Sequence, residues 1–419
     1  MRTLRLAVIS SLLSPLALLS AHVLGAQTPT FAADRLARVD STFDLAVRDR
    51  EIAGAVVLVL KDGQPAYERA FGWSDKESAR KMRTDAIFRI ASQSKAITSV
   101  AIMTLVEEGK VSLFDPVSKF IPGFAHTTVM TKTDAGWTQV PAKRQVVIRD
   151  LLTHSAGISY GTDSSVASLY EAKRLGPAAG WGWYTADKAE PVCTSMERLA
   201  TLPFVAQPGE KFVYGYNTDI LGCVVERASG MPLDQYIAAR ITGPLGMKDT
   251  HFFLPLADRQ RLATVYMSTD SGIVRAPDGP KGQGDYVEGP RMNFAGGAGL
   301  LSSAHDYATF LEMLRRGGEL NGKRILTART VALMTSDQLG PLYGSQGEGF
   351  GLGFRLLLTP GAQGRMESVG TFGWGGAYGS NYEVDPKEHL VLVFMIQQLP
   401  NRSTLPMKWP LLVYEALVR

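Results

Sequence analysis

One serine–lysine pair in this sequence has the spacing that nucleophilic catalysis requires. Ser92 and Lys95 are three residues apart at the start of a segment, 92–108, that we expect to be helical. Residues three apart on a helix project from the same face, so the lysine would lie beside the serine hydroxyl. A serine hydroxyl is a poor nucleophile at neutral pH and needs a nearby base. A lysine can serve if burial or a neighbouring cation lowers its pKa. The pair therefore predicts covalent catalysis at Ser92.

The S-x-x-K pattern occurs twice, and its context separates the two copies. Ser78 and Lys81 lie in a charged stretch, 75–83, with no apolar helix behind them, so we assign that copy to solvent. Ser92 is followed by the apolar run 96–102, which suits a helix in a domain core. The alternative for Ser92 is that it only caps this helix.

Two further segments could add groups to such a site. The stretch from Pro208 to Tyr214 leads into a predicted helix at 218–228, and a phenol at that junction could reach a cleft as an acid–base group. The stretch 372–379 holds four glycines, which allow close approach of the backbone to a ligand. Its backbone N–H groups could form part of an oxyanion hole. Taken singly, the first segment could also hold an ordinary tyrosine and the second a loose hairpin.

Together these segments resemble the serine β-lactamase and penicillin-binding-protein superfamily, over roughly residues 35 to 415. The resemblance implies an α/β (α+β) sandwich, in which an antiparallel sheet is flanked by helices and joined to a mostly helical inserted domain. The matching segments are Phe88–Lys95, Leu113–Val117, Leu151–Gly157, Pro208–Tyr214, Gly296–Leu300 and Trp374–Gly376.

Two departures from the lactamase pattern favour one branch of that superfamily. The usual Tyr-x-Asn motif is replaced by Tyr214-Gly-Tyr216, with Asn217 one place late. The spacing favours Tyr214 as the matching tyrosine and leaves Tyr216 as the alternative. In the third motif Trp374 stands where a lysine usually binds a substrate carboxylate. A tryptophan wall suits an apolar acyl or alcohol group instead. The chain therefore looks most similar to the family VIII carboxylesterases, which are related to class C β-lactamases.

The resemblance also implies a mechanism without metal or organic cofactor. Ser92 would attack the carbonyl of a small-molecule ester, and Lys95 with Tyr214 would form a coupled proton-transfer pair. The backbone N–H groups of Ser92 and Ala377 would hold the oxyanion. The expected substrate-binding residues are Trp374, Gly375, Gly376 and Ala377.

Two other functions remain open at this point. The same machinery could serve a β-lactamase, a DD-peptidase or a D-amino-acid amidase, although Trp374 in place of a lysine argues against these as the main role. The chain could also be a non-catalytic binding or sensor protein, because a fold alone does not give a function. Retention of Ser92, Lys95 and Tyr214 together argues against that alternative.

The elements that must position these residues come from both ends of the chain. An apolar run at 55–60 and a return strand at 64–73 flank Asp62-Gly63, a strong hairpin signal. We expect residues 27–110 and 291–419 to form one discontinuous α/β domain, and residues 111–290 a helical insert. The junction between them would be the cleft.

The N-terminus resembles an export signal. Arg2 and Arg5 precede an apolar run at 6–19, and small residues follow at Gly25 and Ala26. We expect residues 1–26 to be removed and the protein to be periplasmic or secreted, with no membrane span left. The alternative is an uncleaved membrane anchor.

Composition excludes several other classes of protein. Charged residues make up 20% of the chain, with 44 Lys+Arg against 40 Asp+Glu, interspersed rather than patched, so we expect no nucleic-acid partner. The six histidines are scattered, and neither cysteine lies in a metal-binding pattern. Cys193 and Cys223 could pair in an oxidising compartment or remain buried thiols.

Overall fold

The computed structural model describes residues 30–175, 186–280 and 282–418. The predicted signal peptide, residues 1–26, lies outside these ranges. Across the described ranges, no helix combines the length and apolar character needed to cross a bilayer.

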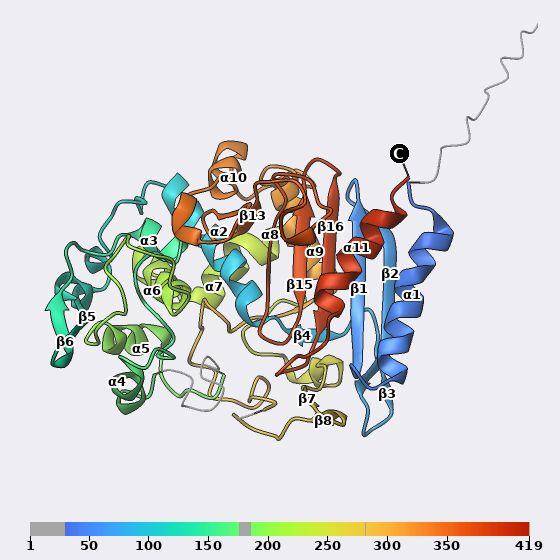
Figure 1. Cartoon of the computed structure of the whole chain (residues 1–419), viewed down its shortest axis with the longest axis horizontal. Helices are drawn as coiled ribbons and strands as arrows, with labels where there is room; N and C mark the ends of the chain where they lie inside the picture. The colour runs from blue at the N-terminus through green and yellow to red at the C-terminus, as the bar shows by residue number, and fades with distance from the viewer. Residues whose placement is uncertain (1–29, 176–185, 281, 419) are drawn as a thin grey trace, which may run out of the picture.

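An eight-stranded antiparallel sheet joins the two ends of the chain, in the order β12-β13-β14-β15-β16-β1-β2-β3 (Figure 1). Its first three strands precede Ser92 and its other five follow residue 347, so the predicted fold class is confirmed. The bounds are β1 Gly54–Lys61, β2 Gln64–Asp75, β3 Arg80–Lys81, β12 Glu348–Phe350, β13 Arg355–Leu357, β14 Phe372–Gly375, β15 Asn381–Asp385 and β16 Leu390–Ile396.

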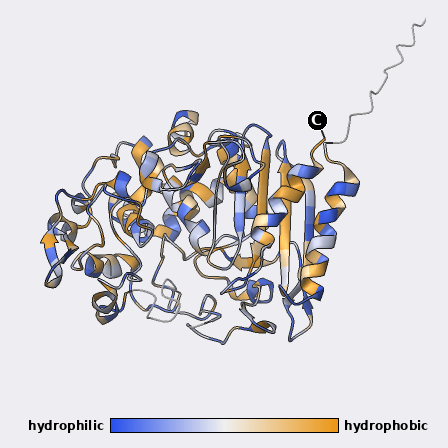
Figure 2. Cartoon of the chain, in the orientation of Figure 1, coloured by the Kyte–Doolittle hydropathy of each residue, from blue (hydrophilic) through white to orange (hydrophobic). Residues whose placement is uncertain are grey.

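The sheet is apolar on both faces because helices cover both. Strand β1 sends Ala55, Val57 and Val59 into one core, with the N- and C-terminal helices α1 (Ala33–Arg48) and α11 (Leu405–Ala416). Its alternate residues enter a second core, where α9 (Ala304–Arg315) packs on β1 and β16. Successive residues of a strand face opposite ways, so an unbroken apolar run marks burial on both sides. Figure 2 shows α1 with an apolar stripe toward the sheet and a polar outer face.

A helical region lies beside the sheet, and the long helix α2 runs through its core. Twelve consecutive residues of α2, Ser94–Leu105, are buried, because the helix packs against α6, α7 and the sheet side at once. The other helices are α3 Ile148–Leu152, α4 Ala167–Ala172, α5 Val192–Leu199, α6 Asn217–Ser229, α7 Leu233–Ile237, α8 Gly243–Leu245 and α10 Ala328–Met334. The short strand β4 (Ile87–Arg89) leads into α2 and pairs with β9 (Leu301–Ser303).

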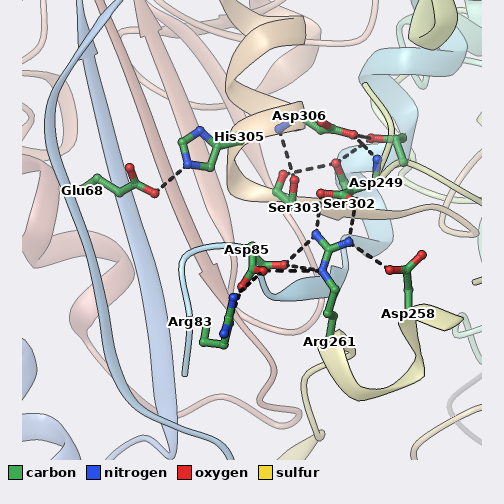
Figure 3. A network of polar contacts seen from close by, with 11 residues as sticks. Glu68, Arg83, Asp85, Asp249, Asp258, Arg261, Ser302, Ser303, His305 and Asp306 are labelled. Atoms are coloured by element: carbon green, nitrogen blue, oxygen red, sulfur yellow. Dashed lines mark hydrogen bonds and ion pairs between the residues drawn. The ribbon is translucent and has the colours of Figure 1, made fainter. Parts of the chain in front are cut away.

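An ion-pair network fixes the chain just before β4 (Figure 3). The Arg261 guanidinium bonds the Asp249 carboxylate at 2.6 and 2.7 Å and the Asp258 carboxylate at 3.1 Å. It also donates to the backbone carbonyl of Asp85 at 2.9 and 3.1 Å. Because Asp85 lies two residues before β4, the network ties the approach to Ser92 to the segment 249–261.

The structure differs from the sequence-based expectation in several elements. The segment 111–290 holds two β-hairpins besides its helices, and a further hairpin, β12–β13, spans residues 348–357. Gly353 adopts a φ of +98°, which only glycine tolerates readily, so the chain turns between β12 and β13. The remaining strands are β5 Thr128–Thr133, β6 Gly136–Pro141, β7 Tyr266–Thr269, β8 Gly272–Arg275, β10 Glu319–Leu320 and β11 Lys323–Arg324.

A disulfide joins Cys193 on α5 to Cys223 on α6, with their Cα atoms 4.9 Å apart. The sequence left this pairing open, because 30 residues separate the two cysteines and only the packing of α5 against α6 brings them together.

Candidate active site

The predicted nucleophile lies at a sharp turn between β4 and α2. Ser92 is in a single 3-10 turn, Ala91–Gln93, from which α2 continues. The preceding residue, Ala91, is buried and has a φ of +44°, in the left-handed region that a side chain disfavours. Such strain persists only where surrounding contacts hold it, and it is typical of functional sites. The turn leaves Ser92 on the wall of a cavity.

Lys95 is buried, and its ammonium nitrogen has three oxygen neighbours. Nζ lies 3.2 Å from Ser92 Oγ, 2.9 Å from the Tyr160 hydroxyl and 2.7 Å from the Gly297 carbonyl oxygen. An ammonium group has three N–H donors, so each of the three oxygens can accept one hydrogen bond from it. The structure thus brings the two residues of the S-x-x-K motif into hydrogen-bond contact.

Tyr160 is a site residue that the sequence reasoning missed. It follows the Leu151–Gly157 segment by three residues and carries no motif of its own. Its ring packs edge-on against both Tyr214 and Tyr216, with centroids 5.8 and 4.8 Å away. Burial raises the pKa of Tyr160 well above its usual value, and the neighbouring Tyr214 adds to this. Tyr160 therefore stays a neutral phenol beside Lys95.

The two residues predicted to distinguish the branch, Tyr214 and Trp374, contact each other. The Trp374 indole N–H donates to the Tyr214 hydroxyl oxygen at 3.1 Å, and both side chains line the cavity. Lys95 Nζ lies 4.7 Å from the centre of the Tyr214 ring. Tyr214 therefore has a neutral donor at its hydroxyl oxygen and a lysine over its ring.

A buried histidine packs against the ring of Tyr214. The His154 ring lies 4.6 Å from the Tyr214 ring, and its Nδ1 accepts from the Asn217 amide at 2.9 Å. Burial holds the pKa of His154 well below its usual value, and the charge of Lys95 adds to this. Asn217, one place late in the motif, thus binds this histidine. Tyr216, the alternative tyrosine, is buried with its ring against Tyr160.

The glycine-rich strand end predicted to bind substrate lies directly against the nucleophile turn. A Cβ on Gly376 would be 2.7 Å from the Ile90 carbonyl oxygen, so only glycine allows this approach. Gly375, Gly376 and Ala377 all line the cavity that Ser92 lines. Ala377 is held in a turn closed by the Gly376 N–H bond to the Ser380 carbonyl at 2.7 Å.

The cavity has a volume of about 940 Å³ and two contrasting walls. Aromatic rings and the start of α11 form an apolar wall, made of Tyr160, Tyr214, Tyr343, Trp374, Pro406, Met407, Pro410 and Leu411. Another part of the lining is charged. Arg355 and Arg365 each bond the Glu383 carboxylate at 2.6 Å. Arg355 also pairs with Glu348, and Arg365 with Glu367. Three carboxylates thus surround two guanidinium groups, which leaves no excess positive charge on this wall.

Within the described part of the chain, no three His, Cys, Asp or Glu side chains are grouped closely enough to hold a metal ion. The groups that the structure places beside the Ser92 hydroxyl are the Lys95 amine nitrogen and, next to it, the phenols of Tyr160 and Tyr214.

A helix-flanked antiparallel sheet with a serine–lysine pair at the start of a buried helix defines the β-lactamase and penicillin-binding-protein class of fold. The chain belongs to the Beta-lactamase family, which it matches over residues 39–415. The resemblance drawn from its motifs is thereby confirmed.

Individual relatives carry different activities in their names. The chain is 34% identical to "Esterase EstB" of Burkholderia gladioli, over 84% of this chain and 88% of EstB. It is 28% identical to a "Putative D-alanyl-D-alanine carboxypeptidase" of Escherichia coli K12, over 84% of this chain and 80% of that one. Among solved structures it resembles "EstCE1, a hydrolase with promiscuous acyltransferase activity", with a TM-score of 0.76 and 28% identity, covering 91% of this chain and 98% of EstCE1.

Proposed function

We propose that this protein is a serine hydrolase that cleaves carboxylic esters through an acyl-serine intermediate. The observation that carries the proposal is the contact of Lys95 Nζ with Ser92 Oγ on the wall of a cavity lined by Tyr214 and Trp374. A nucleophile with a proton-transfer partner in reach and an apolar pocket beside it is the arrangement that acyl transfer requires. The relationship to EstB supports the same activity.

The proposed reaction has two balanced halves. Ser92 Oγ attacks the ester carbonyl carbon while its proton passes to the Lys95–Tyr214 pair, and the carbonyl oxygen becomes an oxyanion near the Ser92 and Ala377 N–H groups. The C–O bond to the alcohol then breaks, and the pair returns the proton to the leaving alcohol. Water, or a second alcohol, repeats the sequence on the acyl-serine and releases the acid or a new ester.

Of the two phenols beside Lys95, Tyr214 suits the role of base. Its hydroxyl oxygen accepts the Trp374 indole N–H, Lys95 lies over its ring, and the side chain lines the same cavity as Ser92. Burial opposes a phenolate on Tyr160, whose hydroxyl instead accepts from Lys95. Lys95 then acts as the ammonium that holds the phenolate.

Two features support neutral esters as substrates rather than carboxylate-bearing peptides. Trp374 offers an aromatic ring and a neutral donor at the position where the resemblance to β-lactamases implies a lysine. The arginines in the cavity, Arg355 and Arg365, are matched by glutamates, so they supply little attraction for a substrate carboxylate.

The test compares substrates on one enzyme. We expect p-nitrophenyl esters of short and medium acids to turn over rapidly, and a chromogenic cephalosporin to turn over at least a hundredfold more slowly. Trp374→Lys should lower the ratio of ester turnover to cephalosporin turnover, because it places a cation at the position where a lysine usually binds a substrate carboxylate. Faster opening of the cephalosporin than of every ester by the wild-type enzyme would overturn the assignment in favour of a lactamase.

We further propose that the protein works outside the cytoplasm. The disulfide between Cys193 and Cys223 supports this, because disulfides persist in oxidising compartments. The mass of the mature chain tests it. Loss of residues 1–26 is expected, whereas a full-length chain retained in the cytoplasm would contradict the proposal.

A further inference from the structure

A buried carboxylate that does not line the cavity is connected to Lys95 through Gly297. Asp219, in the first turn of α6, is only 5% exposed. Its Oδ1 accepts the Gly297 N–H at 3.1 Å, and the carbonyl of the same Gly297 accepts from Lys95 Nζ at 2.7 Å. One residue of backbone therefore connects the carboxylate to the ammonium.

The Gly296-Gly297 segment is held tightly between two helices. From α2, the Thr98 hydroxyl donates to the Gly296 carbonyl at 2.9 Å. From α6, the Thr218 carbonyl oxygen would be 2.7 Å from a Cβ on Gly296, and Asp219 Oδ2 would be 2.5 Å from a Cβ on Gly297. A side chain at either position would push the Gly296-Gly297 segment away from α2 and α6. Both glycines are therefore needed to hold the Gly297 carbonyl against Lys95.

Two lysines from different segments act on Asp219. Lys95 approaches from α2 and Lys188 from the segment before α5, and both oppose the effect of burial, which raises the pKa of Asp219. A buried charge without an opposite charge would be strongly disfavoured. The other titratable groups facing Lys95 are Tyr160, Tyr214 and His154, and Asp219 is the one carboxylate among these groups.

We propose that Asp219 is a positioning residue of this site, which acts through Lys95. It fixes the Gly297 carbonyl that orients the ammonium, and its negative charge favours the protonated form of Lys95. The inference rests on the proposed reaction at Ser92 and adds to it the group that sets the protonation of the Lys95–Tyr214 pair.

The proposal predicts a change that a purely structural residue would not cause. Asp219→Asn keeps the shape and an oxygen acceptor for the Gly297 N–H but removes the charge. Loss of a nearby negative charge lowers a lysine pKa, by about one unit or more for a close group. The limb of the pH–rate profile that reports Lys95 should therefore move to lower pH, whether the reaction uses the ammonium or the free amine.

The experiment measures, over a range of pH, the rate at which a fluorophosphonate labels Ser92 in the mature protein. Asp219→Asn is compared with Asp219→Glu, which keeps the charge, and with Asp306→Asn as a matched control. Asp306 is a partly buried carboxylate in the first turn of α9 that accepts from the Asp249 and Thr250 groups, away from the cavity. Circular dichroism and thermal unfolding establish that each variant is folded.

The expected result is an acid shift of about one pH unit for Asp219→Asn, with the Asp219→Glu and Asp306→Asn profiles in the wild-type position. An unshifted Asp219→Asn profile overturns the proposal, even if the maximal rate falls. If Asp219→Asn does not fold, Gly297→Ala replaces it. That variant displaces the carboxylate, and labelling at least tenfold slower is expected, while an unchanged rate overturns the proposal.

Failure of the ester assignment would look different. Labelling of wild-type Ser92 without ester turnover would refute ester hydrolysis and leave the Asp219 test intact. Absence of labelling in the wild-type protein would overturn both.

Discussion

The two phenols beside Lys95 differ in their surroundings, and this difference assigns their roles. Tyr214 is half-buried on the cavity wall and accepts a hydrogen bond from an indole, whereas Tyr160 is buried and accepts from the ammonium. We expect Tyr214→Phe to lower kcat by roughly a thousandfold, because it removes the base. Tyr160→Phe should cost only about tenfold, the loss of one hydrogen bond to a charged group.

Steady-state kinetics with a p-nitrophenyl ester checks both variants, and thermal unfolding serves as the control for folding. A larger loss in Tyr160→Phe than in Tyr214→Phe would show that the base has been assigned to the wrong phenol.

Trp374 should matter through its N–H group as well as its ring. Trp374→Phe keeps an aromatic wall but removes the donor to the Tyr214 hydroxyl, so the phenolate loses a stabilising contact. We expect kcat/KM for a p-nitrophenyl ester to fall about tenfold, the loss of one hydrogen bond at the reacting groups. Trp137→Phe, at an exposed tryptophan on β6, is the matched control. A kcat/KM equal to the wild type in Trp374→Phe would show that this hydrogen bond has no catalytic role.

The motif residues could be predicted from sequence, but their supporting residues could not. Ser92, Lys95, Tyr214 and Trp374 carry recognisable spacings, and the structure gathers them around one cavity. Tyr160 and Asp219 reach Lys95 only through the packing of loops and helices far apart in sequence. Each by itself reads as an ordinary buried residue, so pattern and spacing gave no signal for them.

At the scale of elements, the end of β14 must fit closely against the turn that holds Ser92. Gly376→Ala would place a Cβ 2.7 Å from the Ile90 carbonyl oxygen and push that turn away. Misplacement of a nucleophile by about 1 Å costs roughly a hundredfold in rate, and we expect a loss of that size in kcat/KM.

Gly375→Ala is the control for this effect, because its nearest neighbour would be the Ser380 carbonyl at 3.3 Å. Ester kinetics and fluorophosphonate labelling rates measure both variants. Equal activity in the two would show that the contact at Ile90 does not position the nucleophile.

Elements with a strong pattern were predictable, and elements set by turns were not. The double-sided core of β1 follows from an unbroken apolar run, and the helix α2 from a long apolar segment after Ser92. The hairpin β12–β13 depends on a left-handed glycine at 353, and the hairpin β5–β6 is largely exposed. Neither hairpin therefore has the alternation of apolar and polar residues by which a strand is predicted from sequence. The C-terminal helix begins at Leu405, because Pro406 is tolerated in a first turn.

At the scale of the whole molecule, the buried His154 should make stability depend on pH. Its pKa is depressed in the folded protein and ordinary, near 6.5, in the unfolded chain. The unfolded state therefore binds a proton first as pH falls. The contribution of His154 to stability is present above pH 6.5 and is lost progressively as pH falls below it, by at most about 1.4 kcal/mol per pH unit.

His154→Asn isolates this contribution. Asparagine tolerates the left-handed backbone at this position, where φ is +55°, and does not titrate. Denaturant unfolding at several pH values below 6.5 should show a shallower pH slope in the variant by about one proton. Equal slopes would mean that His154 is protonated in the folded state.

The central claim is that Ser92 is the nucleophile of an ester hydrolase, and covalent labelling tests it most directly. Mass spectrometry of the intact protein after fluorophosphonate treatment should show one adduct, and peptide mapping should place it on Ser92. Ester turnover should fall in proportion to the fraction of protein that is labelled. Ser92→Ala should be folded, unlabelled and inactive. An adduct at another residue, or a Ser92→Ala variant that hydrolyses esters at the wild-type rate, would contradict the account.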